Sequence, residues 1–294
     1  MVLRPLPSVS VVIPAFNEAA HLAGQLRALA AQDYEGEIEV LVADNGSTDG
    51  TPDVARRVRD EVLPNLRVID ASERPGASVA RNAGVRAASG DLVLFCDADD
   101  VADPGWVRAM VAALEESPLV GGRLEPEALN DPRLLAWRSP PAQTRLPRAE
   151  GYLPFAMGSN MGMRADVLRK LGGFDEDLDR SGEEPELCWR AHLAGEHLGF
   201  APDAVVHYRL RPGLRPLLRQ RRNWGMGSVD LYVRFRHHGM PRASVATALR
   251  RWLELLGSAP LAVTSIERRG RWAARVAYRY GRVRASIEHG VLYL

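Results

Sequence analysis

Short apolar runs alternate with segments of helical periodicity over the first hundred residues. Between the runs, apolar side chains recur every three or four positions, as in Leu22, Leu26 and Leu29, which is the spacing of an amphipathic helix. Pro14 is expected to stop the first strand. Strands that alternate with helices favour βαβ units and a mainly parallel α/β sheet. The runs with the length of buried strands are residues 8–13, 38–42, 66–69 and 92–96.

The pattern changes after residue 99. A Pro-rich stretch over residues 125–154 has few apolar runs and is predicted to be a loop region over the active site. A helix over 165–171 should end at Gly172-Gly173, because glycine commonly terminates helices. Another helix is predicted from Pro185 to about Gly195. Beyond residue 225 the chain reads as helical and basic, with many Trp and Tyr residues.

Three carboxylates follow the apolar run at 92–96. If the backbone stays extended, Asp97 and Asp99 point the same way, because side chains alternate along a strand. Two acids on one face can hold one hard cation, and Mg²⁺ or Mn²⁺ in such sites usually also binds phosphate oxygens. A nucleotide diphosphate is therefore the expected ligand. The alternative to a metal site is a loop of solvated acids. Such a loop would precede a helix that begins at Asp103-Pro104.

Composition indicates an ordinary globular enzyme, and charge is unevenly distributed. The 294 residues include two cysteines, Cys96 and Cys188, expected to be buried thiols. No stretch resembles a secretion signal or a membrane span, so we expect a cytoplasmic protein, with peripheral contact at the inner membrane face left open. Residues 207–294 contain 18 arginines and 4 acids, which gives this region a net charge of +14. The remaining residues carry a net charge of −13. This basic region is expected to pack on the body, to contact an anionic membrane or to join copies in a homodimer.

Five motifs together resemble family 2 glycosyltransferases of the GT-A fold, over about residues 8–225. The resemblance implies a GT-A domain over 1–225, with a nucleotide-binding half (8–100) and an acceptor half (101–225), and a basic helical C-terminal extension over 226–294. It also implies transfer of a sugar from a UDP, GDP or dTDP donor to a saccharide, lipid-linked or small-molecule acceptor, with Mn²⁺ or Mg²⁺ on the diphosphate. The motifs are residues 11–18 (VVIPAFNE), 44–51 (DNGSTDGT), 80–84 (ARNAG), 97–99 (DAD) and 172–176 (GGFDE).

The resemblance assigns the donor site position by position. Asp44 matches the acid that reads the base edge, although it could instead cap the turn at Gly46. Arg81 matches an arginine on the diphosphate side, and its planar guanidinium suits phosphate oxygens; the alternative is a surface helix residue. His207, after an apolar run, matches a third metal ligand beside Asp99, whereas a lone histidine there is otherwise structural. The remaining nucleotide-sugar contacts implied are Pro14, Phe16, Glu18, Asp97 and Ala98.

The catalytic base is the point at which this sequence departs from the family. Relatives commonly show Glu-Asp near the start of the late helix, where this chain has Glu183-Glu184-Pro185. Glu184 occupies the position of the base, and an inverting transfer needs such a carboxylate opposite the leaving group. If Pro185 is the first helical residue, the positive end of the helix favours the ionised form of Glu184. Glu183 as the base, or a structural role for both, stays open.

Acceptor contacts are assigned by the same resemblance to Gly158 and Asn160. Residues 220–224 resemble the Gln-x-x-Arg-Trp motif of processive members, but Asn223 replaces its arginine, which argues against a polymerising synthase. Arg219 or Arg222 near the diphosphate remains a hypothesis.

Two other readings compete with an inverting transferase. One is a retaining GT-A transferase, and the other is a catalytically inactive scaffold that binds nucleotide sugars. Nucleic-acid binding is not expected, because no recognition module is visible.

Overall fold

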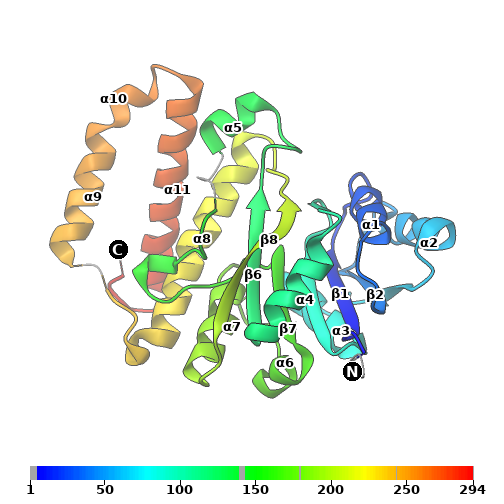
Figure 1. Cartoon of the computed structure of the whole chain (residues 1–294). Coiled ribbons are helices and arrows are strands. Elements are labelled where there is room, and N and C mark those ends of the chain that lie inside the picture. Colours follow the sequence, from blue (N-terminus) through cyan, green and yellow to red (C-terminus); the bar gives the residue numbers. More distant parts are fainter. Residues whose placement is uncertain (1–4, 139–142, 179, 243, 294) are drawn as a thin grey trace.

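An eight-stranded mixed sheet forms the centre of the computed structural model, which describes residues 5–138, 143–178, 180–242 and 244–293 (Figure 1). The strand order is β3-β2-β1-β4-β7-β6-β8-β5. β5 and β7 run opposite to the others, which all point the same way. The predicted α/β class is thus confirmed. The strands are β1 (Val9–Ala15), β2 (Ile38–Asp44), β3 (Leu66–Asp70), β4 (Leu92–Cys96), β5 (Val101–Ala102), β6 (Leu119–Glu125), β7 (Asn160–Arg164) and β8 (Leu198–His207).

The sheet is buried on both faces, as its continuous apolar strands require. Val11 and Ile13 of β1 belong to one core and Val12 to the other, because neighbouring side chains point to opposite faces. Leu22, Leu26 and Leu29 bury their predicted helical stripe in the first core. Helices packed in that core are α1 (Leu22–Ala30), α2 (Thr51–Val62) and α4 (Trp106–Glu116). The opposite face carries α3 (Ala77–Ala87), α6 (Ala165–Leu171), α7 (Glu183–Leu193) and α8 (Leu214–Phe235).

Two element boundaries differ from the prediction. Pro14 does not stop the first strand, because β1 continues to Ala15. Beyond Val12 this strand pairs with β2 alone, and an unpaired edge tolerates a residue without an N–H group. Helix α7 begins at Glu183, two residues before Pro185, after Gly182 in a left-handed conformation with φ of 108°. The predicted glycine stop of α6 is confirmed, with Gly172 at φ of 79°.

The predicted loop over 125–154 contains a short helix and packs partly on the C-terminal region. α5 (Pro132–Arg138) lies beside the long last helix, from which Arg271 Nη1 donates to the Ala136 carbonyl at 3.2 Å. A 3₁₀ turn, η1 (Ala149–Gly151), carries Glu150, which pairs with Arg282 Nη1 at 3.0 Å. Residues 139–142 of this loop lie outside the described residues.

The C-terminal helices continue the fold without a break. α8 runs through residue 225, so the predicted boundary between domain and extension falls inside a helix. α8 and α11 (Ile266–Glu288) cross at glycines: a Cβ on Gly225 would lie 2.0 Å from the Tyr278 carbonyl oxygen, and one on Gly281 would lie 2.1 Å from that of Arg222. Short η2 (Arg236–His238), α9 (Val245–Gly257) and α10 (Ala259–Ala262) connect the two. None of the helices described has both the length and the apolar composition needed to cross a membrane.

Candidate active site

The predicted site residues gather at one edge of the sheet, where the parallel strands end. Glu18 follows β1, Asp44 ends β2 and Asp97 follows β4, and these three strands are adjacent. This carboxyl edge is the usual ligand site of open α/β sheets. β7 runs the other way, so it contributes its first residue, Asn160, to the same edge.

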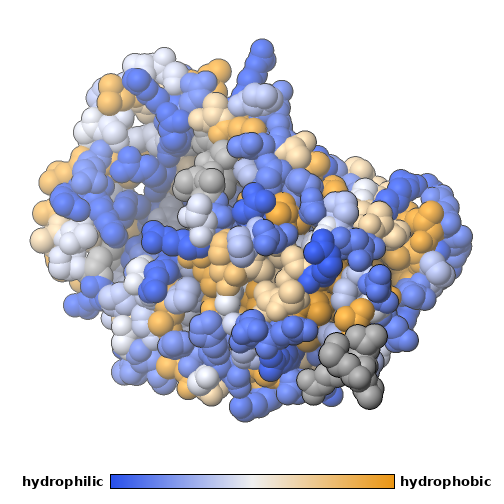
Figure 2. Space-filling model, viewed as in Figure 1, coloured by the Kyte–Doolittle hydropathy of each residue, from blue (hydrophilic) through white to orange (hydrophobic). Residues whose placement is uncertain are grey.

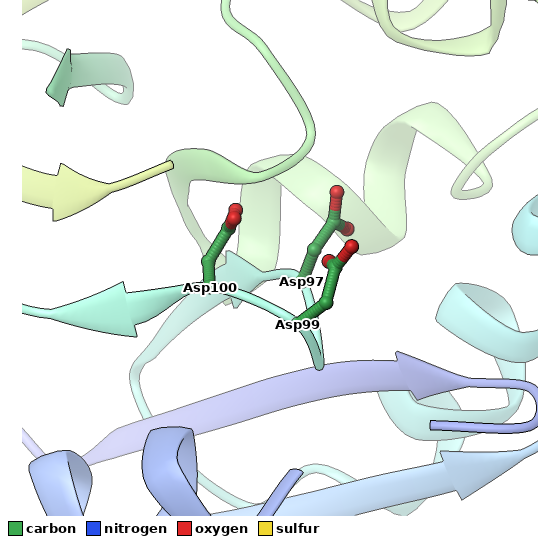
Figure 3. Close-up of side chains that lie close together, drawn as sticks. All are labelled: Asp97, Asp99 and Asp100. Atoms are coloured by element: carbon green, nitrogen blue, oxygen red, sulfur yellow. The ribbon is translucent and has the colours of Figure 1, made fainter. Parts of the chain in front are cut away.

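Three carboxylates converge at the end of β4. Figure 3 shows Asp97 and Asp99 side by side and pointing the same way, with Asp100 projecting to the same side. The direction agrees with the prediction, but its reason does not, because the backbone turns after Cys96 instead of staying extended. One oxygen from each of Asp97, Asp99 and Asp100 lies within 4.8 Å of the others. Burial and the charge of Asp97 raise the pKa of Asp99 to about 6. The same two causes raise the pKa of Asp100 well above its usual range. The acids thus carry an electrostatic cost that a bound cation would relieve.

Buried polar side chains hold the turn that carries these acids. Gln25 of α1 is fully buried; its Nε2 donates to the Asp97 carbonyl at 3.2 Å and its Oε1 accepts from the Ala102 N–H at 2.8 Å. From the other side, Arg209 donates from Nε to the Asp99 carbonyl at 2.8 Å. Ala98 is buried between the two acids. The turn is therefore fixed before any ligand arrives.

The donor set fits a hard divalent cation. All three ligand groups are carboxylates, the type that Mg²⁺ and Mn²⁺ prefer. Asp100 Oδ1 accepts from the Arg209 N–H at 2.7 Å, but its buried Oδ2 has no hydrogen-bond partner among the described residues. An orphaned buried carboxylate oxygen is uncommon and indicates a missing partner.

Arg81 connects this acid cluster to helix α7. Its side chain is 4% exposed, so the alternative of a surface helix residue is wrong. Nη2 lies 3.4 Å from Asp97 Oδ1, and Nη1 donates to Glu183 Oε1 at 3.2 Å. The guanidinium also lies over the Phe174 ring, 5.4 Å from its centroid. Arg81 thus pairs with carboxylates from both sides of the site.

Glu184 lies near the same guanidinium nitrogen of Arg81 as Asp97. Its Oε1 is 3.7 Å from Arg81 Nη2, and its side chain is 20% exposed. Burial and the neighbouring Glu183 raise the pKa of Glu184 to about 8, against the opposing effect of Arg81. Burial of Glu184 thus opposes the ionised form that the helix end was expected to favour.

Gly158 is part of the same contact. A Cβ at this position would lie 2.6 Å from Arg81 Nη2 and 2.7 Å from Glu184 Oε1. A larger residue in the loop before β7 would therefore displace the ends of the Arg81 and Glu184 side chains.

Two interlocked loops follow β1 and β2 at this edge of the sheet. Asn17, in a left-handed conformation with φ of 56°, accepts the Thr48 N–H on its side chain at 2.8 Å. Asp44 Oδ2 accepts the Ser47 N–H at 3.2 Å, so the alternative capping role is present. Its buried Oδ1 has no partner within the described ranges, which leaves an acceptor for a ligand. Nearby, Glu18 pairs with His21 at 3.1 Å, Pro14 is half-buried and Phe16 is exposed.

Two predicted ligand contacts have other partners in this structure. Asn160 is fully buried: Oδ1 accepts from Trp106 Nε1, and Nδ2 donates to the carbonyls of Arg123 and Ala204. Its amide is used inside the protein, so an acceptor contact has no support here. His207 Nδ1 lies 2.7 Å from Glu125 Oε2. Within the residues described, His207 is not part of the acid group that could hold a metal.

Sequence reasoning missed two contributors to the site. Asp100 was counted among the three acids but given no role, although the Asp-Ala-Asp-Asp run contained the signal. Gln25 gave no sequence signal, because it occupies an ordinary helical position and acts through contacts 72 and 77 residues away.

Comparison with known proteins agrees with this geometry. Residues 10–172 match the family described as glycosyl transferase family 2, and residues 147–276 match glycosyl transferase family group 2. The chain belongs to glycosyltransferase family 2. Glycosyltransferase AglE of Haloferax volcanii is 31% identical over 231 residues, or 78% of this chain and 75% of AglE. The pre-mycofactocin glycosyltransferase of Mycobacterium tuberculosis is 29% identical to this glycosyltransferase. The match covers 83% of this chain but only 52% of that relative.

Solved structures show that this family 2 glycosyltransferase has the GT-A fold. Mannosyltransferase PcManGT of Pyrobaculum calidifontis, in complex with GDP-Man and Mn²⁺, superposes with a TM-score of 0.65 at 22% identity. The match covers 96% of this chain and 88% of that one. S. aureus TarS 1-349 with UDP-GlcNAc gives 0.56 at 17% identity, covering 98% and 93%.

Proposed function

We propose that this glycosyltransferase inverts the configuration of the sugar as it transfers it from a nucleotide-diphosphate donor to an acceptor hydroxyl. The observation that carries the proposal is the buried Arg81, which joins Asp97 of the acid cluster to Glu184. Because Arg81 contacts both, the acids proposed to face the leaving diphosphate and the glutamate proposed to face the attacking hydroxyl lie in one site. Nucleotide-sugar complexes of PcManGT and TarS support the donor class.

The donor is assigned to the carboxyl ends of β1, β2 and β4. Asp44 Oδ1 would accept a base N–H, while Glu18, Pro14, Phe16 and Ala98 border the nucleoside. Asp97, Asp99 and Asp100 would hold Mn²⁺ or Mg²⁺, with His207 kept as an untested further ligand. When bound, such a cation neutralises charge on the diphosphate. Arg81 adds a positive charge on the same side.

Glu184 is assigned as the base that takes the acceptor proton. It must be ionised for this, and its pKa of about 8 places that change near physiological pH. Arg81 stabilises the ionised form, while Gly158 leaves room beside the two groups. Asn160 would then act by holding the edge of the sheet in place rather than by touching the acceptor. The acceptor classes considered are a saccharide, a lipid-linked molecule and a small molecule.

A calorimetric titration of UDP-, GDP- and dTDP-sugars tests the donor site, with and without Mn²⁺, on wild type and Asp99→Ala. Metal-dependent binding of one nucleotide class that the variant loses is expected. No binding to any donor would contradict the proposal. Analysis of the product anomer by NMR then separates inversion from retention.

An inactive scaffold is favoured by the burial of Glu184 beside Glu183, which raises its pKa to about 8 and disfavours the ionised form that a base needs. Such a protein would bind donor without turnover and without slow donor hydrolysis at any pH. Metal-dependent transfer or hydrolysis that is lost in Glu184→Gln would eliminate this second candidate.

A further inference from the structure

Helix α9 and the turn after it expose an apolar stripe. Val245, Leu249, Leu253 and Leu256 recur at three- and four-residue intervals, and each is more than half exposed. The stripe continues beyond the helix with Leu261, Val263 and Ile266, which are 55%, 73% and 74% exposed. Contiguous apolar surface of this kind usually marks an interaction site.

The stripe faces outward because the other side of α9 is already packed. Ala248 and Leu255 are buried, and the Leu255 carbonyl accepts from Trp272 Nε1 of α11 at 2.9 Å. Figure 1 shows α9 and α10 on the outer side of α11, at the far end of the molecule from α1 and α2. In Figure 2 hydrophobic residues reach the outer edge of this region among hydrophilic ones.

Exposed arginines lie near the stripe. Residues 242–284 contain ten arginines against Glu254 and Glu267, although one of the ten, Arg282, is buried and pairs with Glu150. Arg250, Arg268 and Arg269 are exposed, on the helices that carry the stripe or directly after it. One of the two acids is already paired, because Glu254 lies 3.5 Å from Arg250. The surface is thus both apolar and strongly positive.

We propose that the α9–α10 surface docks on an anionic phospholipid bilayer. Leucine and isoleucine side chains would enter the boundary of the acyl chains, and arginines would contact lipid phosphates. A second copy of this chain would bring the same positive charge to the contact, and a nucleic acid would leave the leucines in water. The proposal goes beyond sugar transfer and does not depend on it.

Vesicle flotation of the full chain tests this surface, using phosphatidylcholine with or without phosphatidylglycerol. Wild type should float with the anionic vesicles at low salt, be released by high salt and stay unbound with the neutral ones. Leu249→Ser/Leu253→Ser should lower the partition coefficient by roughly a hundredfold, from the lost apolar burial. Arg268→Gln/Arg269→Gln should lower it by about thirtyfold.

Matched control variants replace exposed apolar residues with serine, or exposed arginines with glutamine, at the other end of the protein. Leu6→Ser/Val62→Ser and Arg56→Gln/Arg57→Gln also alter exposed positions and should float like wild type. Circular dichroism checks the fold of each variant. If the leucine variant unfolds, the Arg268→Gln/Arg269→Gln variant still tests vesicle binding, because both arginines are exposed. The proposal is overturned by absence of flotation at low salt or by normal flotation of both α9–α11 variants. A dimer in ultracentrifugation that Leu249→Ser/Leu253→Ser dissociates, without vesicle binding, would assign the surface to a second copy.

Discussion

Arg81 Nη2 lies 3.7 Å from Glu184 Oε1, and this contact links the acid cluster after β4 to the first turn of α7. The two residues come from elements on the same face of the sheet, and both are largely buried. Without Arg81, Glu183 and Glu184 would place two carboxylates side by side with no counter-charge. Arg81 therefore opposes the burial and the Glu183 charge that together raise the pKa of Glu184.

Replacing Glu184 with glutamine should abolish transfer but keep donor binding. We expect kcat to fall roughly 10²–10⁴-fold, the usual contribution of a general base. In wild type, kcat/KM should rise with pH up to about 8. Glu183→Gln serves as the comparison, and the larger loss in that variant would make Glu183 the base.

Glu184 should also make stability depend on pH. Its pKa is raised from 4.5 to about 8 in the fold, so the folded state binds this proton more tightly than the unfolded chain. The contribution is fully present below about pH 4.5 and is lost as pH rises through about 8. Thermal melts of Glu184→Gln should lack this part of the wild-type decline. Parallel wild-type and variant curves across this window would contradict the assigned pKa.

Alanine at position 158 should impair turnover through a steric effect. The added Cβ would press on Arg81 and Glu184, and a displacement of about 1 Å costs on the order of a hundredfold in kcat. Gly257→Ala is the control, because a Cβ there meets nothing within 4 Å. Equal steady-state kinetics for the two variants would show that Gly158 is not constrained.

Asparagine at position 44 should weaken nucleotide binding. Loss of an acceptor for a base N–H should cost about 1.5–3 kcal/mol of donor affinity by calorimetry. Asp53→Asn, an exposed change on α2, should bind donor as wild type does. A wild-type affinity for Asp44→Asn would restrict Asp44 to its turn.

Mn²⁺ should raise the melting temperature of the apoprotein. Binding to the folded state alone stabilises by about 2.7 kcal/mol at a hundred times Kd. Asp100→Asn keeps an acceptor for the Arg209 N–H and removes only charge, so it should lose most of this shift. The exposed Asp166→Asn should keep it. A shift that persists in Asp100→Asn would exclude Asp100 as a ligand.

Local patterns predicted the fold well, and contacts distant in sequence limited the prediction of the site. The alternation of strands and helices follows from side-chain periodicity. The shared direction of Asp97 and Asp99 does not, because β4 ends at Cys96 and the acids lie on the turn after it. Arg81 and Glu183 are 102 positions apart, and no local sequence pattern predicts that α3 and α7 come into contact. The internal partners of Asn160 are also distant in sequence, because its amide bonds to Trp106 and to the carbonyl groups of Arg123 and Ala204.

Strand β7 runs against its neighbours, and this direction brings two different segments of the chain to one edge of the sheet. Asp97 and Asp99 follow β4, whereas Gly158 ends the segment between β6 and β7, part of which packs on α11. Changes in the length or shape of that segment would alter the space beside Glu184 without moving Asp97 or Asp99. One sheet can in this way keep a constant donor site while its acceptor side diversifies.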